Sequence, residues 1–214
     1  MSTSIRPKIL AWGGGSALRL IQVQLQYINL KVNYCFQDDD KPIDVDQLAP
    51  ELRPDLKKAA LECTHYIIAI GAHHGKRRSL LSQLFREVYC LKPLSLIHPT
   101  AYICPTAKIK DPILAFPGAV VHSFAEIDSD CILNTNSVVE HECRIGQGVH
   151  IMGSSVVTGR VSIGNYTTIG TNATILPDLS LESEVFVGAG AVVTKDVAEG
   201  DIVIGIPAKS MHKG

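Results

Sequence analysis

The sequence predicts an α/β domain followed by a parallel β-helix, and two observations carry this prediction. From position 97 to position 193 every sixth residue is aliphatic, and sixteen of these seventeen residues are Ile, Leu or Val. The first 95 or so residues lack this repeat and alternate short apolar strands with helical stretches. A fixed short period indicates a solenoid, because each repeat buries its apolar side chain only against the next one. An α-helix does not fit a period of six, which is a multiple of neither 3.6 nor 3.5.

Strands and helices alternate through the N-terminal part, and this order favours a small parallel α/β domain of Rossmann type. A glycine turn at 13–15 follows the first strand and opens the first helix. The expected strands cover residues 8–12, 31–37 and 66–70, the expected helices run to about 27 and over 54–62 and 76–88, and residues 94–97 enter the repeats.

Three loops of this domain meet at the carboxyl ends of its strands, where parallel sheets bind ligands. A glycine turn that opens a helix presents backbone N–H groups to a phosphate, and an acid after the second strand binds a base or ribose. Each feature also has a simpler interpretation, since three glycines form a tight turn and an Asp triplet forms a solvated one. Together they predict a nucleotide site, with Gly13, Gly14, Gly15, Ser16, Asp38, Asp39 and Gly71 as candidate residues.

Composition argues against several classes of function. The 214 residues carry a formal net charge of −1, which gives no reason to expect nucleic acid or an anionic membrane as a partner. No apolar run reaches about 18 residues and no signal peptide is seen, so we expect a cytoplasmic protein without a membrane span. The six cysteines show no CxxC spacing, and Cys131 and Cys143 fall at the small inward position of the repeat, as packed thiols do.

Two segments near the C-terminus carry a resemblance to a known family. Val187-Gly188-Ala189-Gly190-Ala191-Val192-Val193 and Gly205-Ile206-Pro207-Ala208-Lys209 resemble the hexapeptide-repeat acyltransferases. The resemblance implies a left-handed β-helix of triangular section, with three hexads in each 18-residue coil. It also implies a boundary near residue 95, with a nucleotide-sugar domain at 1–95 and an acetyltransferase domain at 96–214.

A more specific match narrows the family. The segment from Ile132 to Gly146 reads Asn-Thr, then a His followed by an acid, then Ile-Gly. With the two-domain layout, this resembles the bacterial sugar acetyltransferases of bacillosamine and perosamine biosynthesis and their sialic acid O-acetyltransferase branch. The chain departs from the family in its first turn, where Gly15-Ser16-Ala17 places alanine at the family's histidine position.

Transfer of an acetyl group to an amine needs a base, and imidazole suits that task near neutral pH. Of the eight histidines, His141 lies two places after its aliphatic residue, and the residue one coil later at the same position is Gly159. The resemblance implies His141 as general base and the Gly159 amide as oxyanion donor. It implies Glu142 as the acid that orients the imidazole, although neighbouring residues of a strand point to opposite faces, which leaves Glu140 as an alternative.

The resemblance also implies a binding site for acetyl-CoA and an oligomer. His150 matches a family histidine that contacts acetyl-CoA, with an ordinary exposed histidine as the alternative. Thr171 and Ala189 fall where family members offer main chain to the pantetheine arm. Asn134 binds the sugar or forms a ladder between coils. Family members are homotrimers with acetyl-CoA in a groove between adjacent β-helices.

Three functions are compatible with these sequence features. The layout and the His141-Glu142 context favour N-acetylation of a nucleotide-linked 4-amino-4,6-dideoxy sugar, with UDP favoured and dTDP or GDP possible. O-acetylation of a sialic acid-type sugar uses the same residues. A β-helix of another class, such as a binding protein or a γ-class carbonic anhydrase, is the third. The anhydrase needs three converging histidines, whereas His122, His141 and His150 fall at different positions of different hexads, so we expect no metal.

Overall fold

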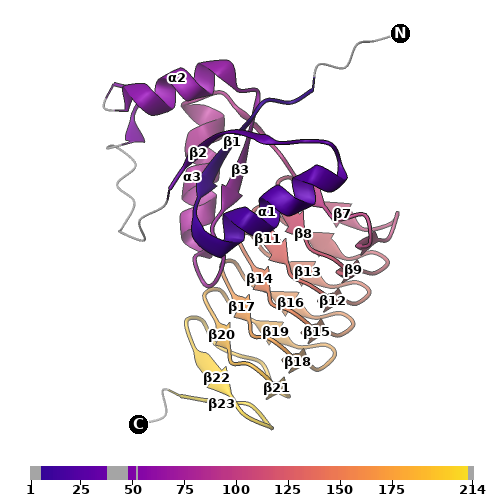
Figure 1. Ribbon diagram of the computed structural model, residues 1–214. Helices are drawn as coiled ribbons and strands as arrows, with labels where there is room; N and C mark the ends of the chain where they lie inside the picture. Colours follow the sequence, from indigo (N-terminus) through magenta and orange to yellow (C-terminus); the bar gives the residue numbers. More distant parts are fainter. Residues whose placement is uncertain (1–5, 38–47, 52, 212–214) are drawn as a thin grey trace. The chain divides into compact units, whose positions relative to one another are not determined.

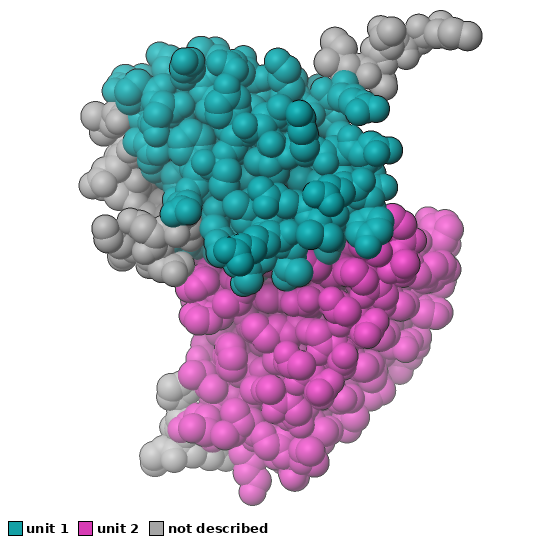
Figure 2. Space-filling view, in the orientation of Figure 1, with its two compact units in different colours: residues 1–70, 77–96 teal, residues 71–76, 97–214 magenta. Residues whose placement is uncertain are grey.

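A computed structural model of the protein describes residues 6–37, 48–51 and 53–211. The chain divides into two compact units, drawn in different colours in Figure 2. Unit 1 consists of residues 1–70 and 77–96, and unit 2 of residues 71–76 and 97–214. Loop 71–76, whose last two residues begin the following helix, was expected in the N-terminal domain and instead packs with the repeats.

Unit 1 contains a four-stranded parallel sheet in the order β2-β1-β3-β4, together with helices (Figure 1). Its largest fully buried side chains are Tyr66 and Phe85, whose rings stack with centroids 5.4 Å apart. The Tyr66 hydroxyl hydrogen-bonds the Ser82 hydroxyl at 2.6 Å. The elements are β1 Ile9–Gly13, α1 Gly15–Tyr27, β2 Val32–Phe36, α2 Pro54–Glu62, β3 His65–Ala69, α3 Gly75–Glu87 and β4 Lys92–Pro93.

The three expected strands and three expected helices are all present in unit 1. The fourth strand, β4, was not predicted, because two residues that include a proline carry no periodic pattern. It pairs with β3 at the edge of the sheet, His65 opposite Lys92. The small parallel sheet agrees with the expected α/β class, whereas the assignment to the Rossmann type stays a prediction.

Unit 2 is a left-handed β-helix whose coils advance by 18 residues. Strands stack in register at that interval, so Ile127 lies beside Ile145 and Ile145 beside Ile163. Three sheets form its faces (Figure 1). The 5-stranded face has the order β19-β16-β13-β10-β7, the 6-stranded face β21-β18-β15-β12-β9-β6, and the 8-stranded face β23-β22-β20-β17-β14-β11-β8-β5.

Most strands of the β-helix contain two residues, as a six-residue repeat with a corner requires. At the C-terminal end, β22 and β23 pair antiparallel. The strands are β5 Leu96–Ile97, β6 Tyr102–Ile103, β7 Lys108–Ile109, β8 Ile113–Ala115, β9 Val120–Val121, β10 Glu126–Ile127, β11 Cys131–Leu133, β12 Val138–Val139, β13 Arg144–Ile145, β14 His150–Ile151, β15 Val156–Val157, β16 Ser162–Ile163, β17 Thr168–Ile169, β18 Thr174–Ile175, β19 Ser180–Leu181, β20 Phe186–Val187, β21 Val192–Val193, β22 Ile202–Ile204 and β23 Lys209–Ser210.

The predicted aliphatic positions form one continuous core from Ala115 to Val193. The smaller residues two places earlier, such as Cys143, Ser155 and Ala173, are also buried. The first coil differs, since Ile97 is 41% exposed. Its strand β5 is the last of the 8-stranded face and has a neighbour on one side only, so the first coil closes the core incompletely.

Each hexad turns its corner through one residue with positive φ. From 118 to 190 such a residue recurs every six positions, and only three of the thirteen are glycines. The others include Phe124, Arg160 and Tyr166, with φ near 60°. Left-handed backbone costs about 1–2 kcal/mol at a non-glycine residue, so the core and the inter-coil hydrogen bonds must hold these corners.

Two further expectations concern membranes and cysteines. Among the described residues, no helix combines the length and the apolar character that crossing a lipid bilayer demands. All six cysteines lie in the described part of the chain, and none forms a disulfide. Cys143 is fully buried, which raises the pKa of its thiol to about 11, and this agrees with the inert packed thiol that the sequence indicated.

Candidate functional site at a corner of the β-helix

His141 lies at the corner between β12 on the 6-stranded face and β13 on the 5-stranded face. The next residue, Glu142, takes the left-handed conformation with φ of 59°. The chain therefore turns between them, and the two side chains meet although they are neighbours in sequence. His141 Nδ1 lies 3.1 Å from Glu142 Oε1. Because a carboxylate only accepts, Nδ1 is the donor, and a neutral His141 then carries its lone pair on Nε2.

Gly159 occupies the same corner one coil later and leaves space beside the imidazole. A Cβ built on Gly159 would lie 2.5 Å from His141 Nε2, closer than real Cβ contacts. The Arg160 amide donates to the His141 carbonyl at 2.9 Å, which fixes the spacing of the two coils at this point. The described residues thus bring His141, Glu142 and Gly159 together, with Nε2 directed at a position that has no side chain.

A charged pair continues the same corner. Arg160 Nε and Nη2 donate to the two carboxylate oxygens of Asp178 at 2.6 and 2.8 Å. Hydrogen bonding from this guanidinium, with a smaller contribution from the nearby His141, holds the pKa of Asp178 below its usual value. Both side chains are at least half exposed, so solvent screens the pair and it contributes little to stability. The sequence analysis did not single out either residue.

His150 and Asn134 lie on the outer side of the 8-stranded face. His150 is 4% exposed, and its Nδ1 lies 2.9 Å from the Ala72 carbonyl oxygen, so Nδ1 donates. Its Nε2 lies 3.4 Å from Asn134 Nδ2, which donates to it. The alternative of an exposed histidine is therefore wrong. Both ring nitrogens have protein partners, and a contact between His150 and acetyl-CoA stays a prediction.

Thr171 and Ala189 lie one coil apart at the corner between the 8-stranded and 6-stranded faces, and both are exposed. The Gly190 amide donates to the Thr171 carbonyl at 2.8 Å. This corner and the His141 corner are at opposite sides of the 6-stranded face. A single chain therefore does not bring the predicted pantetheine contacts next to the predicted base.

The predicted nucleotide residues fall into three groups. Gly13, Gly14, Gly15 and Ser16 form the turn from β1 into α1, where a Cβ on Gly13 would lie 2.3 Å from the Ala69 carbonyl oxygen. Gly14 is the N-cap of α1, without a side-chain cap, and Gly15 has φ of 61°. Asp38 and Asp39 lie outside the described residues. Gly71 opens the loop 71–76, which belongs to unit 2.

Sequence reasoning missed a cavity of about 530 Å³ in unit 2, whose lining includes His73, Lys76, Tyr166 and Phe186. The loop residues are about 90 positions from the repeat residues, and no periodic signal connects them. Within the described ranges, no group of three or more His, Cys, Asp or Glu side chains is arranged to hold a metal ion.

Comparison with known proteins relates this geometry to a family. Residues 142–177 match the family described as bacterial transferase hexapeptide (six repeats). PerB of Caulobacter crescentus, solved with CoA and GDP-perosamine, has a TM-score of 0.83 and 25% identity, over 98% of this chain and 99% of that one. The acetyltransferase domain of PglB from Neisseria gonorrhoeae, solved with acetyl coenzyme A, has a TM-score of 0.77 and 25% identity, over 96% and 99%.

A curated relative matches over a shorter segment. The bifunctional protein GlmU of Geobacillus sp. strain WCH70 is 32% identical over 131 residues, which are 59% of this chain and 28% of that protein. The chain spans less than half the length of the curated relatives it matches.

The contact between His141 and Glu142 predicts which ring nitrogen of neutral His141 carries the proton. We expect long-range proton–nitrogen NMR to show the Nδ1–H tautomer, and Glu142→Gln to shift the ring toward Nε2–H, because an amide presents a donor as well as an acceptor. Glu140→Gln is the matched control and is expected to leave the tautomer unchanged. A shift caused by Glu140→Gln and not by Glu142→Gln would assign the orienting role to Glu140.

Proposed function

We propose that the chain is a hexapeptide-repeat transferase and that it transfers the acetyl group of acetyl-CoA to a sugar. The acceptor that we propose is the amino group of a nucleotide-linked 4-amino-4,6-dideoxy sugar. PerB, solved with CoA and GDP-perosamine, supports this acceptor, and the PglB domain, solved with acetyl coenzyme A, supports the acetyl donor. The sequence resemblance favours UDP as the nucleotide, whereas the GDP-perosamine bound to PerB favours GDP.

One observation carries the proposal: His141 Nε2 faces the space at Gly159 while Nδ1 is held by Glu142. In the proposed reaction the amine attacks the thioester carbonyl carbon, and a C–N bond forms. Nε2 takes the proton that the nitrogen loses. The Gly159 amide donates to the oxyanion of the tetrahedral intermediate. The C–S bond then breaks, and the CoA sulfur leaves as thiolate or takes the proton back from His141.

Glu142 has a positioning role in this proposal. Its carboxylate fixes the Nδ1–H tautomer, so the lone pair of the base points toward the reacting amine. It also stabilises the imidazolium that forms when Nε2 takes up the proton. Asn134 remains a candidate for contact with the sugar. His150, Thr171 and Ala189 remain candidates for contact with the cofactor.

The central test is release of the CoA thiol from acetyl-CoA by wild type and by His141→Ala. The acceptors are UDP-, dTDP- and GDP-linked 4-amino-4,6-dideoxy sugars and free sialic acid. We expect turnover with an amino sugar, and a loss of about 10²–10⁴-fold in kcat for His141→Ala. His122→Ala changes another exposed histidine, one coil before Glu140, and is expected to keep the wild-type rate.

Each other outcome of this assay has a stated meaning. Turnover with sialic acid alone would replace the proposal with O-acetylation. A full rate in His141→Ala would contradict the mechanism with either substrate. Absence of transfer to every acceptor, with acetyl-CoA intact, would contradict the proposed reaction.

We also propose that the protein acts as a homotrimer. The outer side of the 6-stranded face carries a ladder of β-branched side chains, four valines and one threonine, in register: Val120, Val138, Val156, Thr174 and Val192. The corresponding positions of the 5-stranded face are polar, from Lys108 through Glu126 and Arg144 to Ser162. An aliphatic face beside a polar one favours burial against other copies. A neighbouring copy would supply the Thr171 and Ala189 corner that is remote from His141 in one chain.

Val156→Asp is expected to dissociate the trimer, because a carboxylate in an aliphatic contact loses its hydration without gaining a partner. Light scattering after size exclusion measures the mass of the assembly, and circular dichroism checks the fold. Ser162→Asp places the same charge on the 5-stranded face and is expected to remain trimeric. A wild-type protein with the mass of one chain, or a trimeric Val156→Asp, would contradict this assignment of the interface.

A further inference from the structure

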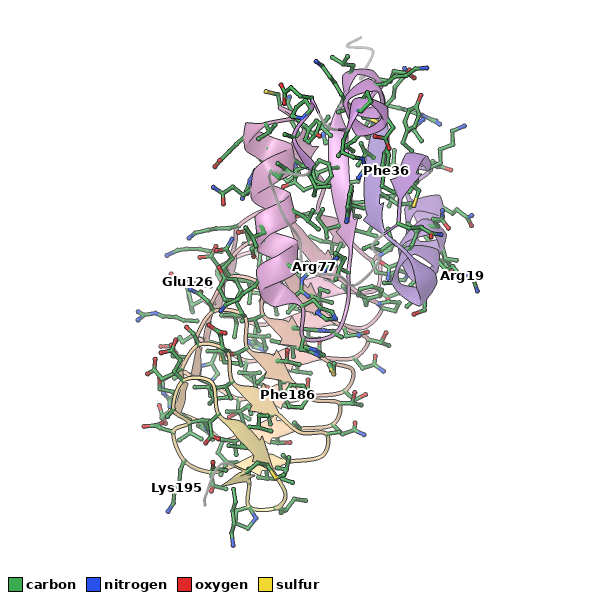
Figure 3. The ribbon with its side chains drawn as sticks, turned by 90° about the vertical axis from the view of Figure 1, so that its left-hand side faces the viewer. Arg19, Phe36, Arg77, Glu126, Phe186 and Lys195 are labelled. Atoms are coloured by element: carbon green, nitrogen blue, oxygen red, sulfur yellow. The ribbon has the colours of Figure 1, made fainter. Side chains whose placement is uncertain are left out.

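The cavity of unit 2 beside Lys76, about 530 Å³ in volume, is built from two separate parts of the sequence. Loop 71–76 contributes a histidine and a lysine, and the β-helix contributes rings, an aliphatic side chain and a carboxylate. Phe186, labelled in Figure 3, projects from β20 on the 8-stranded face. Six of the side chains that line the cavity are His73, Lys76, Tyr166, Glu184, Phe186 and Ile202.

The β-helix fixes one wall of this cavity. Thr168, Phe186 and Ile202 are paired in register on three successive strands, so their side chains form a row on the outer side of the 8-stranded face. Tyr166 and Glu184 lie 18 residues apart at the adjoining corner, both with φ near 61°. This wall is as rigid as the coils that carry it.

The loop forms the other wall and is fixed by close backbone contacts. A Cβ on Gly75 would lie 2.3 Å from the Gly148 carbonyl oxygen, so only glycine permits this approach. The Ala72 carbonyl accepts a hydrogen bond from His150 Nδ1 at 2.9 Å. His73 therefore lies between two fixed points of the backbone, and Lys76 follows directly after the second.

Lys76, at the edge of the cavity, pairs with Glu184 in a way that an anionic ligand can replace. Lys76 Nζ lies 2.6 Å from Glu184 Oε1 and 6.0 Å from the centre of the Tyr166 ring. The Lys76 and Glu184 side chains are 59% and 42% exposed, and ion pairs of that kind contribute little. A phosphate group, with more charge and more acceptor oxygens than one carboxylate, competes well for Lys76.

The apolar part of the cavity suits a flat ring. Tyr166 and Phe186 are half-buried, and Ile202 is 38% exposed. Aromatic rings that stay accessible on a rigid surface offer stacking partners for a nucleotide base, and base–aromatic stacking is worth about 1–3 kcal/mol per base. Rings beside a lysine and a histidine are thus a site for a base or sugar ring joined to phosphates.

We propose that this cavity binds a nucleoside diphosphate group. The strands β17 and β20 carry Thr168 and Phe186, and the corner with Thr171 and Ala189 follows at their carboxyl ends. Thr168 and Thr171 are three positions apart, as are Phe186 and Ala189, which is about 10 Å along an extended chain. The ligand in the cavity therefore lies beside the predicted path of the pantetheine arm. This inference rests on the proposed function, because both of its substrates, acetyl-CoA and the nucleotide-linked sugar, contain a nucleoside diphosphate group.

Calorimetric titration tests the proposal with CoA, UDP, dTDP and GDP as separate probes. Lys76→Met removes the charge and keeps the length, and Phe186→Leu removes the ring and keeps an apolar side chain. We expect each variant to weaken binding of the recognised probe about tenfold. Lys110→Met is the matched control, because Lys110 is an exposed, ion-paired lysine on the 5-stranded face, and it is expected to bind as wild type does.

The probe that responds identifies the source of the group. A loss confined to CoA assigns the cavity to the cofactor, and a loss confined to one of the other three assigns it to the acceptor. If no probe binds, or if Lys76→Met and Phe186→Leu bind every probe as wild type does, the proposal is wrong. Circular dichroism of both variants shows that a loss of binding is not a loss of fold.

Binding and transfer separate this proposal from the proposed function. Nucleotide binding that depends on Lys76 and Phe186, without acetyl transfer to any acceptor, would contradict the function and leave the cavity assigned. Transfer that depends on His141, with an unchanged KM for both substrates in Lys76→Met and Phe186→Leu, would contradict the cavity and leave the function standing.

Discussion

The structure depends on the stacking of one aliphatic side chain per hexad along the inside of the β-helix. Each of these side chains packs on the residue 18 positions away, and backbone hydrogen bonds hold the two coils in register. Because residues 18 positions apart stack on one another, Gly159 lies beside His141 and Phe186 lies beside Thr168. The same packing must sustain ten non-glycine corners in left-handed conformation, one of which brings Glu142 to His141.

The period of six was sufficient to predict the core of the β-helix, and strand–helix alternation was sufficient for the six main elements of unit 1. The corners were not predictable in the same way. Asn136 and Asp130 are residue types that accept positive φ, but Phe124, Tyr166 and Arg160 are not, and their conformation follows from closure of the coil. For this reason the sequence left Glu140 and Glu142 open, whereas the geometry brings Glu142 into contact. Ile97 followed the period and is exposed, because a repeat at the end has one neighbour.

Contacts between distant segments explain the remaining differences at the site. The sequence marked His150 for its resemblance alone, whereas the structure buries it under Ala72, which is 78 residues away. The cavity beside Lys76 has the same origin, since loop 71–76 packs on coils more than 70 residues later. No local sequence pattern predicts a contact between segments so far apart in the chain. The glycine turn at 13–15 was predicted from local signals, and the close approach of Gly13 to Ala69 gives its physical reason.

In the proposed mechanism, the space between Gly159 and His141 Nε2 holds the reacting amine and thioester. The most direct test of this mechanism is the rate of acetyl transfer by Gly159→Ala, compared with Gly153→Ala at another corner of the β-helix. A Cβ at Gly159 would lie 2.5 Å from His141 Nε2, whereas the nearest atom to a Cβ at Gly153 is the Thr135 carbonyl oxygen at 3.3 Å. We expect Gly159→Ala to lose about 10²–10³-fold in kcat and Gly153→Ala to stay near wild type. A Gly159→Ala enzyme that is folded and fully active would contradict the account.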